Sequence, residues 1–372
     1  MSASLGMSLL LVALPIILVG DGHGYAVASI VAGAGGAGAA AVALPVGWAT
    51  DRWGPARVGA GSLLAMVGSA AVMMASKSVT ILGFGHFVFG AGALGVTLSR
   101  QADLTRRIPL LLRGRAMSLM GGTMRLTGLL GTLIGGALLD VAGARWTFGA
   151  AGLGAAIGIP AVLPGALKPE REVAPIGAGG PGLLEVVRAN RRRLMHAGIF
   201  GMAAMTTREG RRVLLPLVGV ALDLRPSTIG ILVAAGYSAD LILFPLSGYI
   251  MDRLGRLAAM VPAYGLLALG LLSLLLVDST TGVLFSGLMM GVGNGLSAGS
   301  LATLTGDLAP EEGTASFLSG VALLTDVGRV LGPLVVAVVA SLGNLDGVAA
   351  GLALAMILGL IWLVTVVGET ST

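Results

Sequence analysis

Eight charged side chains, all of Arg, Asp or Glu, lie inside long apolar runs of this 372-residue chain, where charged groups are rare. They are Arg125, Arg208, Glu209, Arg211, Arg212, Asp240, Asp326 and Arg329. A charged group in lipid hydrocarbon costs at least about 2.5–3.5 kcal/mol, so each is expected to face a partner or a water-filled space. Arginine presents a rigid fork of donors that matches a carboxylate or phosphate. The basic excess of this set favours an anionic or hydrogen-bonding ligand, unless the three acids neutralise three of the five arginines.

The densest group of these charges falls between residues 208 and 212. Arg208, Arg211 and Arg212 stand at i, i+3 and i+4, so on a helix they share one face, and Glu209 is within reach of Arg212. Such a face cannot point into lipid. We expect it to line a central cavity.

The carboxylates of this set are candidates for proton exchange. A carboxyl group buried among apolar residues and beside an arginine is balanced between its protonated and ionised forms. Glu209 and Asp240 are therefore the first candidates, and permanent pairing with arginine is the alternative. Asp326 is a further candidate, although Arg329 three residues on allows a purely structural ion pair.

The amino-acid composition indicates the class of protein that holds these charged groups. Only 11% of the residues are charged and 55% are hydrophobic, whereas soluble domains carry about 25% charged residues. The mean hydropathy of +0.94 also excludes a disordered chain, so we expect a membrane protein. With no cysteine and three histidines, neither a metal site nor a cofactor is expected. Basic residues scattered between apolar runs, with 4% aromatics, argue against a nucleic-acid partner.

Apolar runs long enough to cross a bilayer can be marked twelve times. Their extents are 5–20, 25–48, 58–76, 79–99, 116–139, 146–165, 194–219, 227–250, 257–277, 281–303, 315–341 and 347–367. The longest polar interval follows the sixth run. We therefore predict an all-α membrane protein with a six-helix bundle over 1–167, a linker over 168–193 and a second six-helix bundle over 194–372.

The distribution of basic residues predicts the orientation. Fifteen Lys and Arg residues fall on the side of the linker and only three on the other side. Because an excess of Lys and Arg marks the cytoplasmic face, both termini and the 168–193 linker are assigned to it in the cytoplasmic membrane. All four tryptophans fall near the ends of predicted spans, as in interfacial aromatic belts.

A repeat relates the two halves. A shift of 201 residues aligns Gly47, Asp51, Arg52 and Gly54 with Gly248, Asp252, Arg253 and Gly255, and each set is followed by a further arginine, Arg57 or Arg256. Glycine allows helices to approach closely, the aspartate suits a helix N-terminus, and the arginine can pair across the loop. The same shift would start the first span about seven residues before Met1, so either that span is short or the natural chain begins earlier.

The doubled Gly-x-x-x-Asp-Arg-x-Gly loop resembles the signature of the major facilitator superfamily. The resemblance implies two pseudo-symmetric six-helix bundles, with these loops as gating elements. Pro55 and Ala56 replace basic residues in the first copy, which weakens a gating role there. Gly128 to Gly136 also resembles the family's antiporter element with Thr132 in place of proline, although small residues at this spacing equally serve helix packing.

His86 stands where many members of that family carry an arginine, four residues before a glycine that is Gly90 here. Because histidine titrates near neutral pH, His86 is a further proton-relay candidate. The alternative is a histidine hydrogen-bonded inside the helix bundle.

The resemblance and the buried charges together predict a secondary active transporter. We expect a monomer that moves a small organic solute by alternating access, as a proton-coupled exporter, with uptake or exchange of an organic anion as the alternative. A membrane sensor that keeps a transporter fold is the competing class. No Walker loop is present, and no enzyme activity is expected.

Overall fold

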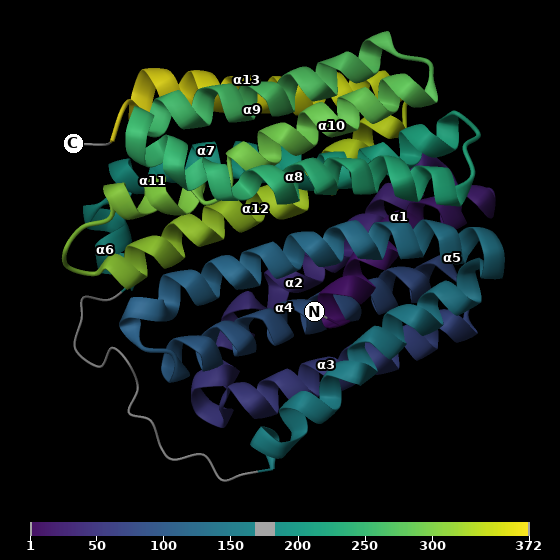
Figure 1. The fold of residues 1–372 in the computed structure, drawn as a ribbon, viewed down its shortest axis with the longest axis horizontal. Helices are drawn as coiled ribbons and strands as arrows, with labels where there is room; N and C mark the ends of the chain where they lie inside the picture. The colour runs from purple at the N-terminus through teal and green to yellow at the C-terminus, as the bar shows by residue number, and fades with distance from the viewer. Residues whose placement is uncertain (1, 168–182, 371–372) are drawn as a thin grey trace. The chain divides into compact units, whose positions relative to one another are not determined.

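The computed structural model describes residues 2–167 and 183–370, and nearly all of them are helical (Figure 1). The helices are α1 (Ser2–Gly20), α2 (Tyr25–Trp53), α3 (Pro55–Ala75), α4 (Val79–Arg107), α5 (Leu110–Ala166), α6 (Leu183–Ala189), α7 (Arg191–Ala221), α8 (Pro226–Leu254), α9 (Arg256–Ser273), α10 (Thr280–Leu296), α11 (Ser300–Leu308), α12 (Thr314–Ala340) and α13 (Leu345–Trp362). A 3₁₀ turn, Leu274–Leu276, extends α9, and a π-helix, Leu363–Val367, extends α13. The predicted all-α fold with twelve spans is confirmed.

Three features reconcile the thirteen helices of the described residues with twelve spans. The long α5 holds the fifth and sixth spans, which meet at Gly143, a residue in a left-handed conformation with φ of 80°. The tenth span consists of α10 and α11, and α6 lies within the predicted linker. Residues 168–182 of that linker lie outside the described residues.

Nine of the described helices are long and apolar enough to cross a membrane. Helix α10 is not among the nine because it has only 17 residues. Helix α7 is not among them because charged residues interrupt its apolar sequence. Two helices have a side-chain N-cap. The Ser279 hydroxyl accepts a hydrogen bond from the Gly282 N–H at the start of α10, and the Asn344 amide oxygen accepts one from the Gly347 N–H at the start of α13.

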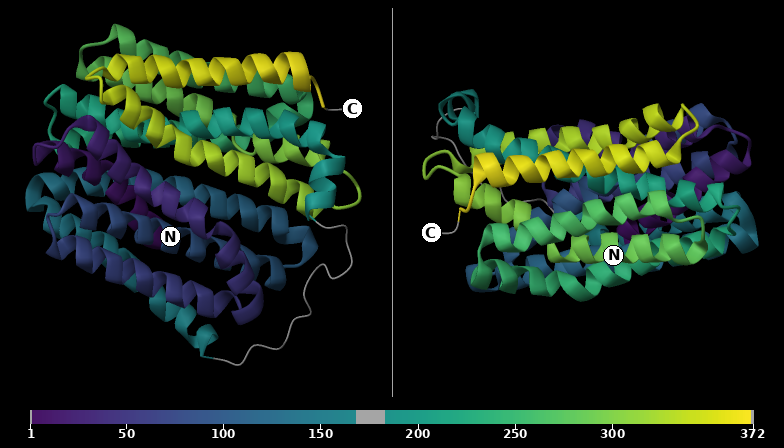
Figure 2. Two further views of the ribbon diagram at one scale, coloured as in Figure 1. Left: turned by 180° about the vertical axis from the view of Figure 1, so that it is seen from behind. Right: turned by 90° about the horizontal axis from the view of Figure 1, so that it is seen from above.

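The chain divides into two compact units. Among the described residues, unit 1 holds 2–167 and 219–234, and unit 2 holds 183–218 and 235–370. In unit 1, α1 packs on α5, α2 on α4, and α3 on both α4 and α5 (Figure 2). The segment 219–234 joins this unit through α5, where the Ser227 hydroxyl donates to Asp140 at 2.5 Å.

Unit 2 is built around α9, which packs against α10 and α13, while α12 packs against α13. The short helix α6 packs against α12 through a cluster of apolar side chains. Val186 of α6 and Leu194 of α7 pack there with Phe317 and Val321 of α12. The described end of the predicted linker is therefore part of a packed core.

The 201-residue repeat is visible in the helix crossings. In unit 1, Gly90 of α4 lies against the carbonyl of Gly35 in α2, so closely that an added Cβ would overlap it. In unit 2, Gly291 of α10 lies against the carbonyl of Gly236 in α8 in the same way. Gly90 and Gly291 are 201 residues apart in the sequence, and so are Gly35 and Gly236. Glycine permits this backbone approach because it has no side chain.

The glycines that resemble an antiporter element also pack helices. A Cβ on Gly131 of α5 would come 2.8 Å from the Leu5 carbonyl oxygen of α1, and one on Gly135 would come 2.9 Å from the Leu9 oxygen. In the second half, a Cβ on Gly332 of α12 would come 2.6 Å from the Thr206 oxygen of α7. These contacts account for the small residues by close helix approach.

Candidate functional site: charged residues inside the helices

Arg208 is oriented by neutral groups from other helices of unit 2. Its Nη2 donates to the Ser297 hydroxyl at 2.7 Å and to the Tyr264 hydroxyl at 3.1 Å. Its guanidinium carbon also lies 5.2 Å from the centre of the Tyr264 ring, a cation–π distance. Phe200 meets that ring edge to face, with 5.0 Å between ring centres. These partners fix the guanidinium in place without neutralising its charge.

Asp240 is a buried carboxylate on α8. It is only 3% exposed, and its Oδ2 accepts a hydrogen bond of 2.7 Å from the Asn294 amide of α10. Arg211, 7% exposed, lies close enough to Asp240 and Tyr237 to interact with both electrostatically. The structure thus brings two of the predicted site residues into one buried cluster.

The two predicted intrahelical ion pairs are formed. Arg212 Nη1 donates to both carboxylate oxygens of Glu209, at 2.8 and 3.0 Å. On α12, Arg329 Nη2 lies 3.3 Å from the Asp326 carboxylate. The Arg212 side chain is 40% exposed, whereas Arg211 is only 7% exposed. The two neighbouring arginines therefore differ in their access to solvent.

Arg125 and His86 belong to unit 1. Arg125 Nη1 donates to the Gly121 carbonyl of its own helix at 3.3 Å. His86 is 1% exposed, and its Nδ1 lies 2.9 Å from the Val31 carbonyl of α2, which requires a proton on Nδ1. Its Nε2 is buried with no hydrogen-bond partner among the described residues and faces Gly35. The ring therefore ties α4 to α2, as the packing alternative expects.

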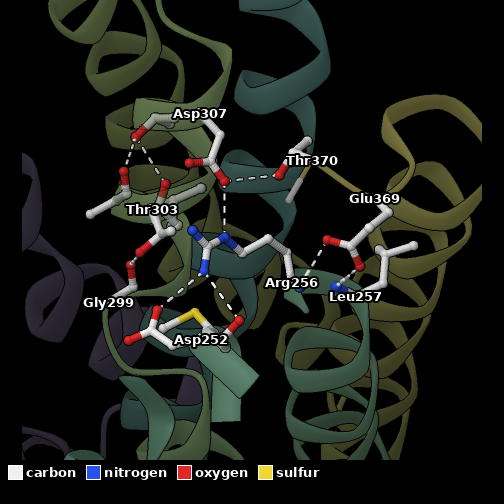
Figure 3. A network of polar contacts seen from close by, with 12 residues as sticks. Asp252, Arg256, Leu257, Gly299, Thr303, Asp307, Glu369 and Thr370 are labelled. Carbon is white, nitrogen blue, oxygen red and sulfur yellow. Dashed lines mark hydrogen bonds and ion pairs between the residues drawn. The ribbon is translucent and has the colours of Figure 1, made fainter. Parts of the chain in front are cut away.

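The second copy of the loop motif forms a network of polar contacts (Figure 3). Arg256 Nε donates to Asp307 at 3.0 Å, and its Nη1 lies 3.5 Å from Asp252. The Glu369 carboxylate accepts the backbone N–H groups of both Arg256 and Leu257, each at 2.9 Å. In this copy the acid at the helix N-terminus is therefore Glu369, which the sequence analysis missed. Its carboxylate satisfies two of the donors left open at the start of α9.

The two copies share their turn and an arginine stacked on an aromatic ring. Gly54 and Gly255 both take left-handed conformations, with φ of 82° and 93°, which end one helix and start the next. Arg52 lies 5.5 Å from the Trp48 ring centre, and Arg253 lies 5.0 Å from the ring centre of Tyr249.

The copies differ at the residue after the turn glycine. Pro55 occupies the position of Arg256, so the first copy has no side chain there to form the network of Figure 3. Arg57 instead donates to the Ala166 carbonyl at the end of α5, at 3.2 Å. An added Cβ at Gly47 or Gly248 meets no described atom of its own unit within 4 Å, so neither glycine serves close helix packing inside its unit.

Removal of the Glu369 carboxylate should loosen the start of α9. We expect Glu369→Ala to lower stability by about 0.5–2 kcal/mol, as the loss of a helix cap does, and to speed amide exchange at Arg256 and Leu257. Hydrogen exchange of the purified protein, read on peptides covering this turn, measures the effect. Glu312→Ala, at an exposed position, is the matched control. Equal exchange in the two variants would contradict the capping role.

Three partner residues of the buried charges were not found from the sequence. They are Tyr264, Asn294 and Ser297, all polar groups inside predicted spans. The available signal was a hydroxyl or amide in an otherwise apolar run, but these groups are uncharged and their partners stand 54 to 89 residues away.

Similar proteins agree with the fold. A bacterial homologue of the human lysosomal transporter Spinster, solved inward-facing and unoccupied, matches with a TM-score of 0.71 at 15% identity, covering 98% of this chain and 92% of that one. Two structures of a POT family transporter, one with a thioalcohol-conjugated peptide and one with 5-aminolevulinic acid, each match with a TM-score of 0.79 at 15% identity and cover 98% of this chain and 93% of theirs. A search of curated proteins gives no match.

The sequence itself matches a family model over its whole length. The description of that model is Major Facilitator Superfamily, and it matches residues 1–207 and again residues 204–371. The double match agrees with the 201-residue repeat. The chain belongs to the Major Facilitator Superfamily.

Proposed function

We propose that this protein is a secondary active transporter that exports a small organic solute by alternating access, coupled to protons. The observation that carries the proposal is Asp240, a carboxylate 3% exposed in the interior of a spanning helix. An ionisable group at such a position is costly and is usually retained for function. The two similar POT family transporter structures were solved in complex with organic molecules, which agrees with a small organic solute.

One partner of Asp240 suits proton exchange, and Arg211 lies near the same carboxylate. Asn294 donates through its neutral amide, and a carboxyl oxygen can accept that bond whether or not the group carries a proton. Glu209 differs, because Arg212 holds both of its oxygens and favours the ionised form. Asp326 is likewise paired with Arg329. We therefore propose Asp240, which is 3% exposed and more deeply buried than Glu209 or Asp326, as the main coupling group, with Glu209, Asp326 and His86 as secondary candidates.

The orientation belongs to the same proposal. We place the protein in the cytoplasmic membrane as a monomer, with both termini and the 168–193 linker on the cytoplasmic side, because the basic residues collect there. The loop containing Asp252 and Arg256 is then a cytoplasmic element, and its network is suited to hold α8, α9 and α11 in one conformation.

A flux assay tests the proposal. Purified protein is first screened for compounds that raise its thermal stability, and any hit is then followed as labelled solute in proteoliposomes. We expect flux against the solute gradient when a pH gradient is imposed and none in protein-free liposomes. Binding without flux would favour a sensor, and flux that ignores the pH gradient would overturn proton coupling.

Uptake or exchange of an organic anion is the second candidate function. It is favoured by the Nε atoms of Arg208, Arg211 and Arg212, which are buried without a hydrogen-bond partner among the described residues. Three guanidinium donors of this kind suit a carboxylate or phosphate.

Lysine substitution separates this candidate from export of neutral or cationic solutes. Arg208→Lys keeps the charge but loses the fork, so we expect an apparent affinity for carboxylate ligands about tenfold weaker. Arg329→Lys on α12 is the control and should leave that affinity nearly unchanged. The measurement is the ligand concentration that gives half of the thermal shift. Stabilisation by cations alone, equal in both variants, would exclude the anion candidate.

A further inference from the structure

A cavity outside the buried charge cluster lies between the start of α7 and the end of α13. Its volume is about 410 Å³, and it is lined by Arg191, Arg192, Met195, His196, Trp362 and Val366. All six residues belong to unit 2. The cavity takes no part in the function proposed above.

The polar side of this cavity is cationic. Arg191 and Arg192 are exposed, and no carboxylate is among the lining residues. The first turn of α7 also holds no acidic residue. Two guanidinium groups among the lining residues supply donors of the kind that a phosphate diester accepts.

The other lining residues include an apolar group around Trp362. Trp362 Nε1 donates to the His196 carbonyl at 3.2 Å, and the two rings meet edge to face with centres 6.2 Å apart. Because the indole N–H is engaged, Trp362 offers the cavity its ring surface. Met195 and Val366 extend that surface with side chains that are 45% and 38% exposed.

An apolar path leads away from the cavity along α13. Leu354, Leu358 and Ile361 follow one another at helical spacing, and each is more than half exposed. This helix is among the candidate membrane spans, with a large share of its surface uncovered by protein. A ligand that joins an anionic head to a long apolar tail fits both parts, whereas a soluble anion uses only the first.

We infer that this cavity binds the phosphate of an anionic phospholipid, with Arg191 and Arg192 on the headgroup and the acyl chain along Trp362 and the exposed face of α13. Basic pockets beside spanning helices are suited to acidic lipid headgroups. Tryptophan at the end of a span sits at the level of the lipid headgroups.

Lipid titration of the whole purified protein tests the inference. Native mass spectrometry in detergent counts bound phosphatidylglycerol, phosphatidylcholine or glycerol phosphate, a soluble phosphate ester without acyl chains. We expect phosphatidylglycerol to bind about tenfold more tightly than phosphatidylcholine, and glycerol phosphate to bind far more weakly than the lipid. Equal binding of the two lipids would overturn the inference. Equal binding of glycerol phosphate would also overturn it and leave a plain anion site.

Two matched pairs of substitutions locate the binding. Arg191→Gln with Arg192→Gln removes both guanidinium charges of the cavity, and we expect phosphatidylglycerol affinity to fall about tenfold or more. Arg188→Gln with Arg193→Gln removes two exposed charges nearby that do not line the cavity and should leave the affinity nearly unchanged. Equal losses in both pairs would mean that binding depends on general charge, against the inference. The wild-type titration decides the lipid preference even if one of the variants does not fold.

Discussion

Replacement of Asp240 with asparagine is expected to abolish accumulation of the transported solute driven by a pH gradient. Asparagine keeps the size of the side chain and an oxygen that accepts the 2.7 Å bond from Asn294, so the local packing is retained. It cannot bind and release a proton. The coupling step is lost, while exchange of solute between two equal pools should continue.

The measurement is solute accumulation in proteoliposomes with and without an imposed pH gradient. Asp326→Asn is the matched control, because Asp326 is a carboxylate in a spanning helix that is already paired with Arg329. His86→Asn is a second control, since an asparagine amide can replace Nδ1 as donor to Val31. Both controls should keep their dependence on the gradient. If Asp240→Asn accumulates solute like the wild type, Asp240 is not the coupling group.

Alanine at Gly291 is expected to destabilise the protein severely. The added Cβ would overlap the carbonyl of Gly236 in α8, and a backbone atom cannot rotate away as a side chain can. Overpacking of this kind costs about 1–3 kcal/mol and more where the backbone must shift. Gly90→Ala should behave alike, because Gly90 meets the Gly35 carbonyl in unit 1.

Gly248→Ala and Gly47→Ala are the matched controls for this pair. Both glycines are helical, and an added Cβ meets no described atom within 4 Å. Alanine there should leave stability unchanged or raise it by about 0.5–1 kcal/mol through helix propensity. Thermal unfolding in detergent, followed by intrinsic fluorescence, compares the four variants. A Gly291→Ala protein as stable as Gly248→Ala would show that the crossing is not tight.

The helix-forming runs could be predicted closely from the sequence. The expected span 227–250 corresponds to α8, Pro226–Leu254. The expected break between the fifth and sixth spans falls at Gly143. These features are local, because hydropathy and glycine or proline content depend only on neighbouring residues. The ion pairs Glu209–Arg212 and Asp326–Arg329 were predictable for the same reason, since helical geometry alone brings residues three apart together.

The partners of the other charges could not be predicted in this way. Arg208 meets Ser297 across 89 residues of sequence, Asp240 meets Asn294 across 54, and Arg256 meets Glu369 across 113. The position of a hydroxyl or amide in an apolar run does not indicate which other helix will supply its hydrogen-bond partner. Glu369 in particular reads as an ordinary acid near the chain end, and only the packing of α13 beside α9 places it on the helix N-terminus.

Local composition and residue spacing identify this chain as a helical membrane protein of two related halves, and they locate the charged residues inside its spans. The packing of the helices shows which of those charges are paired within one helix and which have partners on other helices. The reason is physical: insertion into a bilayer depends on the composition of each segment, whereas a hydrogen bond between helices depends on their rotation and approach. In this protein the approach is set by glycines such as Gly90 and Gly291, whose effect appears only when two helices are brought into contact.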